Sequence, residues 1–176
     1  MSPDAKRRRS IAAVYLSLAF AGPPVSAGTA GAPKPPKAGD AERLISRVEG
    51  RYEVSTGGIE RSLTILRHGK DSVYFQVMLV NQFGGSHSCS LSGFASYDAG
   101  AFVHKDKQEP SCRLELRPGA KELRVLDGGS CHAYCGVAAA MEAGVFPLSA
   151  RRKLDAGALR KSEDYLWDLK ESGQVP

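Results

Sequence analysis

Cysteine is the residue type of this chain best suited to chemistry, and all four cysteines lie in the middle of the sequence. They are Cys89, Cys112, Cys131 and Cys135, and three of the four histidines, His87, His104 and His132, lie in the same region. Thiols and imidazoles together allow disulfide formation, metal binding or redox exchange. The choice among these depends first on the compartment in which the protein folds.

The N-terminus has the pattern of a secretory signal peptide. Lys6 to Arg9 are basic, residues 11–21 form a short apolar run, and Val25-Ser26-Ala27 supplies small residues for cleavage after Ala27. We therefore predict export to the periplasm or the medium, where an even number of cysteines favours disulfides. An uncleaved anchor is the alternative, and the arginine run leaves open whether export follows the general or the twin-arginine route.

The charge of the chain argues against a nucleic-acid-binding role. The formal net charge is +5, but Lys6 to Arg9 together with Asp4 supply +3 of it and are removed with the signal peptide. The remaining charge is too small for a basic surface that binds a phosphate backbone. No segment after the signal peptide is apolar and long enough to predict a transmembrane helix.

The preferred disulfide pairing joins sequence neighbours, Cys89 with Cys112 and Cys131 with Cys135. This pairing has a geometric difficulty, because the strands expected to carry Cys89 and Cys112 flank a third strand and would lie about 9.5 Å apart. A disulfide requires Cα atoms roughly 4.4–6.8 Å apart. The pairing of Cys112 with Cys131 across adjacent strands therefore stays open as the rival.

Metal, redox and catalytic chemistry find less support in the sequence. Cys131 and Cys135 lack the two-residue gap of common zinc sites, and no second pair repeats their spacing. No βαβ pattern surrounds them, and Gly136 stands where covalent haem attachment requires a histidine. The chain has no nucleophile elbow, phosphate-binding glycine loop or His-Glu-x-x-His motif. We predict a non-enzymatic protein without metal or cofactor.

Alternation of apolar and polar residues predicts β-structure around the cysteines. Residues 89–97 and 112–117 follow this two-residue period, which is typical of strands with one buried face. Val73 to Val80 is apolar on both faces and predicts a central strand. Turn signals separate seven or eight such segments without long helical crossovers. The pattern favours an all-β fold, a small antiparallel up-and-down barrel of about eight strands, over a small sandwich.

Composition divides the chain into four parts. These are a signal peptide (1–27), a linker rich in Pro, Ala and Gly (28–40), a β-barrel domain that begins with a short helix (41–147), and a helical tail (148–176). Asp40 is predicted to cap the first helix and Ser162 the last one. Tyr165 and Trp167 are predicted to dock the tail on the barrel or on a partner.

One end of the predicted barrel is a candidate binding surface. In a meander, the cysteines together with His87, His104 and His132 fall at the same end, whereas His68 falls at the opposite end. The candidate partner-binding residues at this end are Phe83, His87, His132 and Tyr134. Phe83 lies in a glycine-containing loop, where an exposed aromatic ring anchors partners. The alternative is that Phe83 folds back as a lid on the barrel mouth.

The chain resembles the small exported β-barrel proteins grouped with bacterial lysozyme inhibitors. The resemblance covers Gly50 to Phe146 and comprises the signal peptide, the Gly50-Arg51-Tyr52 opening, cysteines in alternating strands, and Cys135-Gly136 before a final Gly144-Val145-Phe146. Inhibitors of this kind insert a Ser-Gly-x-x-Tyr loop into the lysozyme active site. Here Ser92 to Tyr97 has one residue too many for that motif and is predicted to lie inside a strand.

Three functions follow as hypotheses. The first is a non-enzymatic exported binding protein, for which the resemblance implies a cell-wall hydrolase such as lysozyme as partner. The second is a calycin-like carrier that holds a small apolar ligand in a cavity lined by Phe75, Val77, Leu91 and Leu114. The third is a structural envelope protein whose tail helix docks on a larger assembly.

Overall fold

A computed structural model describes residues 39–82, 87–137, 139–141 and 144–173. The predicted signal peptide and nearly all of the predicted linker lie outside the described residues. The described residues belong to one compact unit, and the helices among them are few and short.

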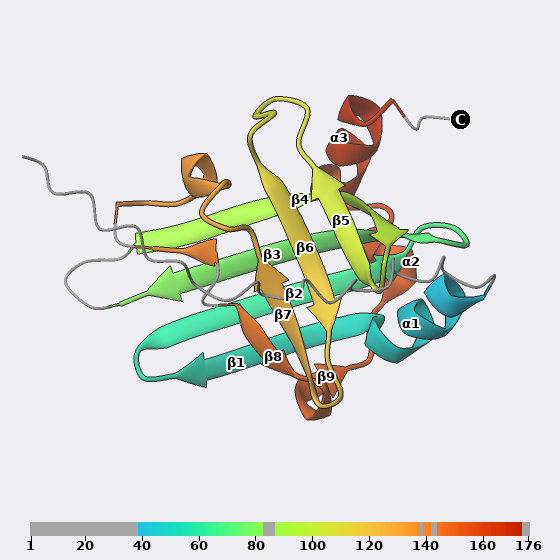
Figure 1. The fold of residues 1–176 in the computed structure, drawn as a ribbon, viewed down its shortest axis with the longest axis horizontal. Helices are drawn as coiled ribbons and strands as arrows, with labels where there is room; N and C mark the ends of the chain where they lie inside the picture. The colour runs from blue at the N-terminus through green and yellow to red at the C-terminus, as the bar shows by residue number, and fades with distance from the viewer. Residues whose placement is uncertain (1–38, 83–86, 138, 142–143, 174–176) are drawn as a thin grey trace, which may run out of the picture. The chain divides into compact units, whose positions relative to one another are not determined.

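Within the described residues the strands form one antiparallel sheet of nine strands in the order β8-β7-β6-β5-β4-β3-β2-β1-β9 (Figure 1). The strands are β1 (Gly50–Thr56), β2 (Ile59–Arg67), β3 (Ser72–Asn81), β4 (His87–Asp98), β5 (Ala101–Lys105), β6 (Arg113–Pro118), β7 (Glu122–Leu126), β8 (Val145–Pro147) and β9 (Arg151–Arg152). From β1 to β8 each strand pairs with its neighbours in sequence. The predicted up-and-down meander is therefore confirmed.

The sheet curls into a nearly closed barrel. Its two edge strands, β8 and β9, follow one another in the chain. β8 pairs with β7, β9 pairs with β1, and the short 3-10 helix η3 (Leu148–Ala150) joins them. Tyr52 on β1 and Phe146 on β8 pack edge to face across this closure, with ring centroids 6.2 Å apart. The sequence had predicted about eight strands, and the two-residue β9 was too short to be recognised from a periodic pattern.

Tight turns hold the register between neighbouring strands. Gly57 and Gly58 have φ values of 57° and 71° between the paired residues Thr56 and Ile59. Two positive φ values in a two-residue turn match the right-handed twist of the flanking strands, and glycine adopts them without steric cost. Here local sequence alone determines the turn.

The barrel interior is filled by apolar side chains from every strand from β1 to β8. The largest fully buried side chains include Tyr52, Phe75, Phe102 and Phe146. Helix α1 (Asp40–Val48) contributes Ile45 and Val48 to the same core. The predicted helix is present, but it begins at Asp40, one residue earlier than predicted, so the predicted Asp40 cap is wrong and Gly39 occupies the capping position.

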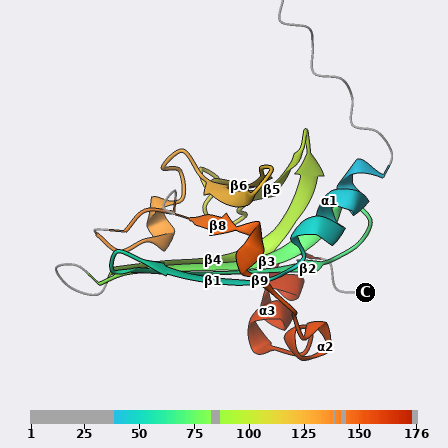
Figure 2. The same cartoon turned by 90° about the horizontal axis from the view of Figure 1, so that it is seen from below.

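The C-terminal segment packs on the outer face of the sheet. Helices α2 (Ala156–Leu159) and α3 (Glu163–Glu171) lie on the side of β1–β4 opposite to β5, β6 and β8 (Figure 2). Tyr165 of α3 is 6% exposed, its ring centroid lies 4.8 Å from that of Tyr74, and its hydroxyl lies 3.1 Å from Nδ1 of His68. The Tyr74 hydroxyl donates to Asp168 (3.0 Å), and burial together with this carboxylate raises the pKa of Tyr74.

The sequence predictions for this tail are confirmed in part. The Ser162 hydroxyl accepts a hydrogen bond from the backbone N–H of Tyr165, as predicted for an N-cap. Tyr165 docks α3 on the barrel. Trp167 does not, because its side chain is 60% exposed on the helix surface.

We expect Tyr52→Phe to lower the free energy of unfolding by about 1 kcal/mol, because the buried Tyr52 hydroxyl donates to the Val48 carbonyl at 2.7 Å. This bond ties the end of α1 to the closure between β1 and β8. Urea denaturation of the mature chain measures the change, with Tyr97→Phe on the partly exposed face of β4 as a control. Equal stability of Tyr52→Phe and wild type would contradict the assigned role of the hydroxyl.

Candidate functional site

The end of the barrel that carries the cysteines is organised by a mismatch in strand length. β4 pairs with β3 along its length from Ser96 back to His87, whereas β5 pairs with β4 only from Ser96 to Asp98. β4 has 12 residues and β5 has 5. The two strands therefore diverge, and the residues of β4 from His87 to Ala95 have no partner on β5. Their backbone groups need other partners, because an open strand edge attracts unwanted pairing.

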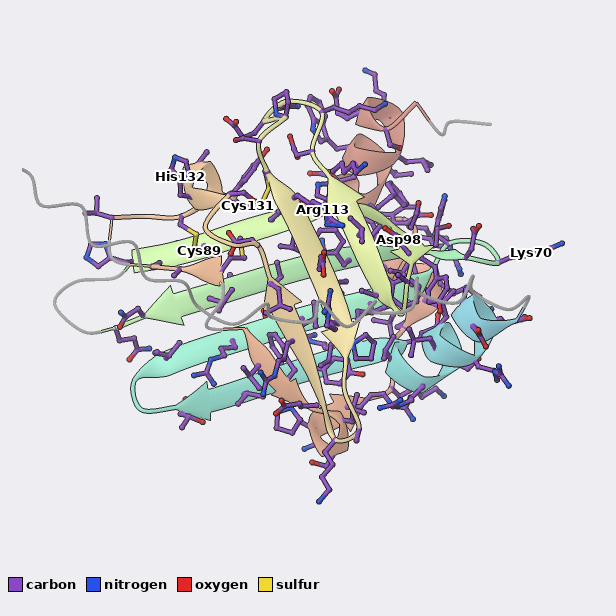
Figure 3. All side chains as sticks on the ribbon, viewed as in Figure 1. Lys70, Cys89, Asp98, Arg113, Cys131 and His132 are labelled. Atoms are coloured by element: carbon purple, nitrogen blue, oxygen red, sulfur yellow. A yellow bond between two sulfur atoms is a disulfide. The ribbon has the colours of Figure 1, made fainter. Side chains whose placement is uncertain are left out.

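The segment from Ser130 to Val137, which we name the clip, covers this seam. Cys131 at its start bonds to Cys112 just before β6, and Cys135 near its end bonds to Cys89 on β4. The Cα–Cα distances are 4.4 Å and 4.0 Å respectively. Figure 3 shows Cys89, Cys131 and His132 gathered at this end of the barrel.

The preferred disulfide pairing predicted from the sequence is wrong, and the rival Cys112–Cys131 bond is confirmed. The prediction relied on proximity along the chain. In the structure the clip crosses from β6 to β4, so its first cysteine meets Cys112 and its last meets Cys89. The short 3-10 helix η1 (His132–Tyr134) separates Cys131 from Cys135.

Hydrogen bonds fix both ends of the clip in addition to the disulfides. At the β4 end, the N–H of Gly136 donates to the Ser88 carbonyl at 2.8 Å, and Cys89 and Cys135 form a β-bridge. At the other end, the buried Asp127 carboxylate accepts from the N–H of Cys131 at 3.1 Å. The clip is therefore held at four points over a short length of chain.

A buried polar network lies beneath the clip. His104 on β5 points its Nδ1 at the Phe94 carbonyl (2.9 Å) and its Nε2 at Asp106 (3.4 Å), and the Tyr134 hydroxyl also bonds to Asp106. The side chains of His104 and Asp106 are 9% and 13% exposed. Because the Phe94 carbonyl can only accept, Nδ1 is the donor of that bond. The ring thus replaces the missing strand partner of Phe94.

The electrostatics of this network follow from its hydrogen bonds. Burial raises the pKa of Asp106, but bonds from the N–H groups of Glu109 and Gln108 and from the side chains of Tyr134 and His104 outweigh burial and lower the pKa overall. Burial, together with the bond to the Asp106 carboxylate and its charge, raises the pKa of Tyr134 to about 12. Tyr134 is therefore a stable hydrogen-bond donor that ties the clip to the loop after β5.

The structure places three of the four predicted partner-binding residues at the clip. His132 is exposed, Tyr134 is half-buried, and His87 begins β4 close to Gly136. Phe83 lies outside the described residues. His104 belongs to the network, but it does not lie at the cysteine-bearing end of the barrel as predicted. Because β5 is short, its ring lies beside Gly93 and Phe94 in the middle of β4.

Sequence reasoning missed two residues that build the site. Asp106 accepts the N–H groups of Gln108 and Glu109 at 2.7 Å each, which is an Asx turn. Asp127 accepts from the clip in the same manner at the turn before it. Both aspartates start polar turns, which the sequence could have shown, whereas the bond from Tyr134 to Asp106 depends on the fold.

Among the described residues there is neither a side-chain cluster that could hold a metal ion nor a helix that could cross a membrane. No group of three or more His, Cys, Asp or Glu side chains there could hold a metal ion. None of the helices among these residues has the length and apolar character needed to cross a membrane. The two disulfides indicate an oxidising, extracytoplasmic environment.

The segment that resembles the inhibitory loop lies inside β4, as predicted. Ser92 to Ser96 pair with β3, Tyr97 pairs with Phe102 of β5, and Gly93 faces the interior against the His104 ring. It therefore cannot project into an active site as a loop. The sequence matches no protein-family model, and no curated protein or solved structure is significantly similar to the chain. Of the features predicted together with the resemblance, the antiparallel β-barrel is observed, and these comparisons identify no family.

We expect Gly93→Ala to destabilise the protein by about 1–3 kcal/mol through overpacking. A Cβ atom at Gly93 would lie 2.7 Å from Cε1 of His104, so the ring would have to move and lose its bond to Phe94. Thermal and urea unfolding measure the effect. The control is Gly119→Ala, where the nearest atom would lie 3.4 Å away, and equal effects of the two substitutions would contradict the proposed packing.

The contribution of Asp106 to stability is expected to depend on pH. Because its pKa is lower in the folded protein than the ordinary value of 3.8, the charged carboxylate stabilises the fold above that value. This stabilisation is lost as the pH falls through the folded-state pKa. Asp106→Asn should therefore lower the free energy of unfolding at neutral pH, and the difference from wild type should shrink in acid.

Denaturant unfolding of wild type and Asp106→Asn at a series of pH values measures this linkage. The matched control is Asp98→Asn at the exposed turn between β4 and β5. A wild-type-minus-variant difference that stays constant from neutral pH to strong acid would show that the Asp106 charge does not stabilise the fold.

Proposed function

We propose that the protein is an exported, non-enzymatic binding protein that docks a protein partner through the clip. The observation that carries this proposal is that an exposed segment is held rigid at both ends. His132, Ala133 and Val137 are exposed, and Val137 is fully so. Between and beside them, both cysteines and Tyr134 are tied to the barrel.

Rigidity matters because binding normally costs the conformational entropy of the interface. Each mobile side chain or loop that becomes ordered costs about 0.5–1.5 kcal/mol. The clip is already ordered in the free protein by the disulfides and by the hydrogen bonds to Asp127 and Ser88, so it loses little conformational entropy on binding. The exposed imidazole of His132 and the apolar Val137 then offer polar and apolar contacts on a preformed surface.

A cell-wall hydrolase of the lysozyme type is the partner that we propose, and the compartment is the periplasm or the medium. The signal-peptide pattern, the two disulfides and the β-barrel architecture support it. Because Ser92 to Tyr97 is part of β4, the clip takes the place of the inhibitory loop in this proposal.

The carrier hypothesis receives less support from the barrel interior. Phe75, Val77, Leu91 and Leu114 are at most 5% exposed and pack against one another and their neighbours in one core cluster. A ligand cavity between them would require these contacts to open. A role as a structural envelope protein remains compatible with the exposed Leu166 and Trp167 of α3.

The test is a titration of the purified mature chain into lysozymes of several structural classes, with lysis of bacterial cells as the readout. We expect near-stoichiometric slowing by wild type. The double variant His132→Ala/Val137→Ser should weaken binding about tenfold, roughly 1.4 kcal/mol, because it removes the exposed contacts without touching the core. Leu166→Ala is the matched control, because Leu166 is exposed on α3, which lies on the side of β1–β4 opposite to β5, β6 and β8 (Figure 2).

A second variant tests the role of rigidity. Cys112→Ala/Cys131→Ala releases one end of the clip but leaves the Cys89–Cys135 bond. This variant should bind the lysozyme more weakly than wild type does. Circular dichroism checks that the variant is folded. Absence of slowing with every lysozyme class would reject the lysozyme partner, and equal binding by wild type and both clip variants would reject the clip.

A further inference from the structure

A second surface feature lies away from the exposed clip residues, in a cleft of about 220 Å³ between α3 and the diverging ends of β4 and β5. Its walls come from three parts of the chain. They include Ser92 and Phe94 of β4, Lys105 and Gln108 at and after the end of β5, and Trp167 and Glu171 of α3.

The cleft is held open by fixed walls. Tyr165 and the bond from Tyr74 to Asp168 anchor α3 on the sheet. On the other side, Lys107 Nζ donates to the Ser172 carbonyl at 2.8 Å, which joins the loop after β5 to the C-terminal end of α3. A ligand would therefore enter a preformed site, as small-molecule sites usually are.

Trp167 forms one wall of this cleft and is 60% exposed. Tyr165, two residues earlier, is buried against the sheet, so the docking of α3 does not use the indole ring. A large aromatic face left beside a rigid polar cleft is suited to stack on a ligand that has an apolar face of its own.

The charges around the cleft favour an uncharged ligand. Lys105 and Lys107 are cationic, whereas Asp106, Asp168 and Glu171 are anionic, and the Asp106 carboxylate already accepts the N–H groups of Gln108 and Glu109. An anion would meet the three carboxylates and a cation the two ammonium groups, so neither sign is complementary to the whole cleft. A purely apolar ligand would bury these charged groups without hydrogen bonds, which is costly.

We propose that this cleft binds a neutral saccharide, with Trp167 stacking on the sugar ring and the charged side chains bonding its hydroxyls. A sugar combines an apolar C–H face with hydroxyls that both donate and accept, and bonds to charged groups are the stronger ones. The cleft is smaller than the roughly 300–1,000 Å³ of sites for drug-sized ligands, so we assign it one sugar unit of a chain. This site is independent of the protein-docking function proposed for the clip.

The experiment uses the fact that Trp167 is the single tryptophan of the whole chain, so its fluorescence reports on this site alone. Neutral trisaccharides of N-acetylglucosamine, β-linked glucose and α-linked glucose are titrated into the mature protein. We expect at least one of them to shift the emission to shorter wavelength with a Kd of about 1 mM or lower. Inorganic phosphate and arginine, as anionic and cationic probes, should leave the emission unchanged.

Variants then locate the binding, with calorimetry as a readout independent of tryptophan. Trp167→Ala should abolish the heat of binding, Trp167→Phe should retain part of it, and Glu171→Gln should weaken it about tenfold. Leu166→Ala, next in sequence but not part of the cleft, should bind as wild type does.

Two results would overturn the saccharide assignment. One is an emission spectrum that no trisaccharide changes, or that only phosphate or arginine changes. The other is full binding of a trisaccharide by both Trp167→Ala and Glu171→Gln. Either result leaves the clip proposal untouched, because these substitutions do not involve His132, Val137 or the cysteines.

Discussion

The divergence of β4 from β5 is the constraint on which the rest of this structure depends. A twelve-residue strand beside a five-residue strand leaves backbone groups without a ladder partner in the middle of an otherwise regular barrel. The chain resolves this mismatch twice: the His104 ring supplies a donor to Phe94, and the clip supplies a β-bridge at Cys89. The ring acts from the end of β5 and the clip from the segment after β7, so the two solutions serve different positions along the unpaired part of β4.

The two disulfides make this arrangement stable in a small domain. On the chain-entropy model, closing the loop between Cys112 and Cys131 contributes about 3 kcal/mol, and closing the longer loop between Cys89 and Cys135 somewhat more. Because both bonds end on one short segment, they also remove its freedom to move. The same covalent bonds that close the seam therefore create a rigid exposed surface, and the seam they leave open toward α3 becomes the cleft beside Trp167.

Much of the fold was predictable because it depends on local patterns. The period-two alternation of β3 and β4 and the glycine turns specify strands in order, and short loops force neighbours to pair antiparallel. β9 was not predictable, because two residues carry no period. The preferred cysteine pairing was wrong, and only the rival Cys112–Cys131 bond was anticipated, because the pairing depends on where the segment after β7 crosses from β6 to β4. Asp106 was overlooked for the same reason, because its turn role is visible in sequence but its bond to Tyr134 is long-range. Asp127 was overlooked although both of its bonds, to Gly129 and Cys131, are local.

The amino-acid sequence by itself determined the class of fold, the meander order of the strands and the use of cysteines as disulfides, because alternation, turn residues and an even thiol count act over a few residues. Only the tertiary structure decided which thiols bond, that Tyr165 rather than Trp167 docks the tail, and that His104, Asp106 and Tyr134 form one network. These contacts join residues far apart in the chain, and they follow from how strands of unequal length curve around one core.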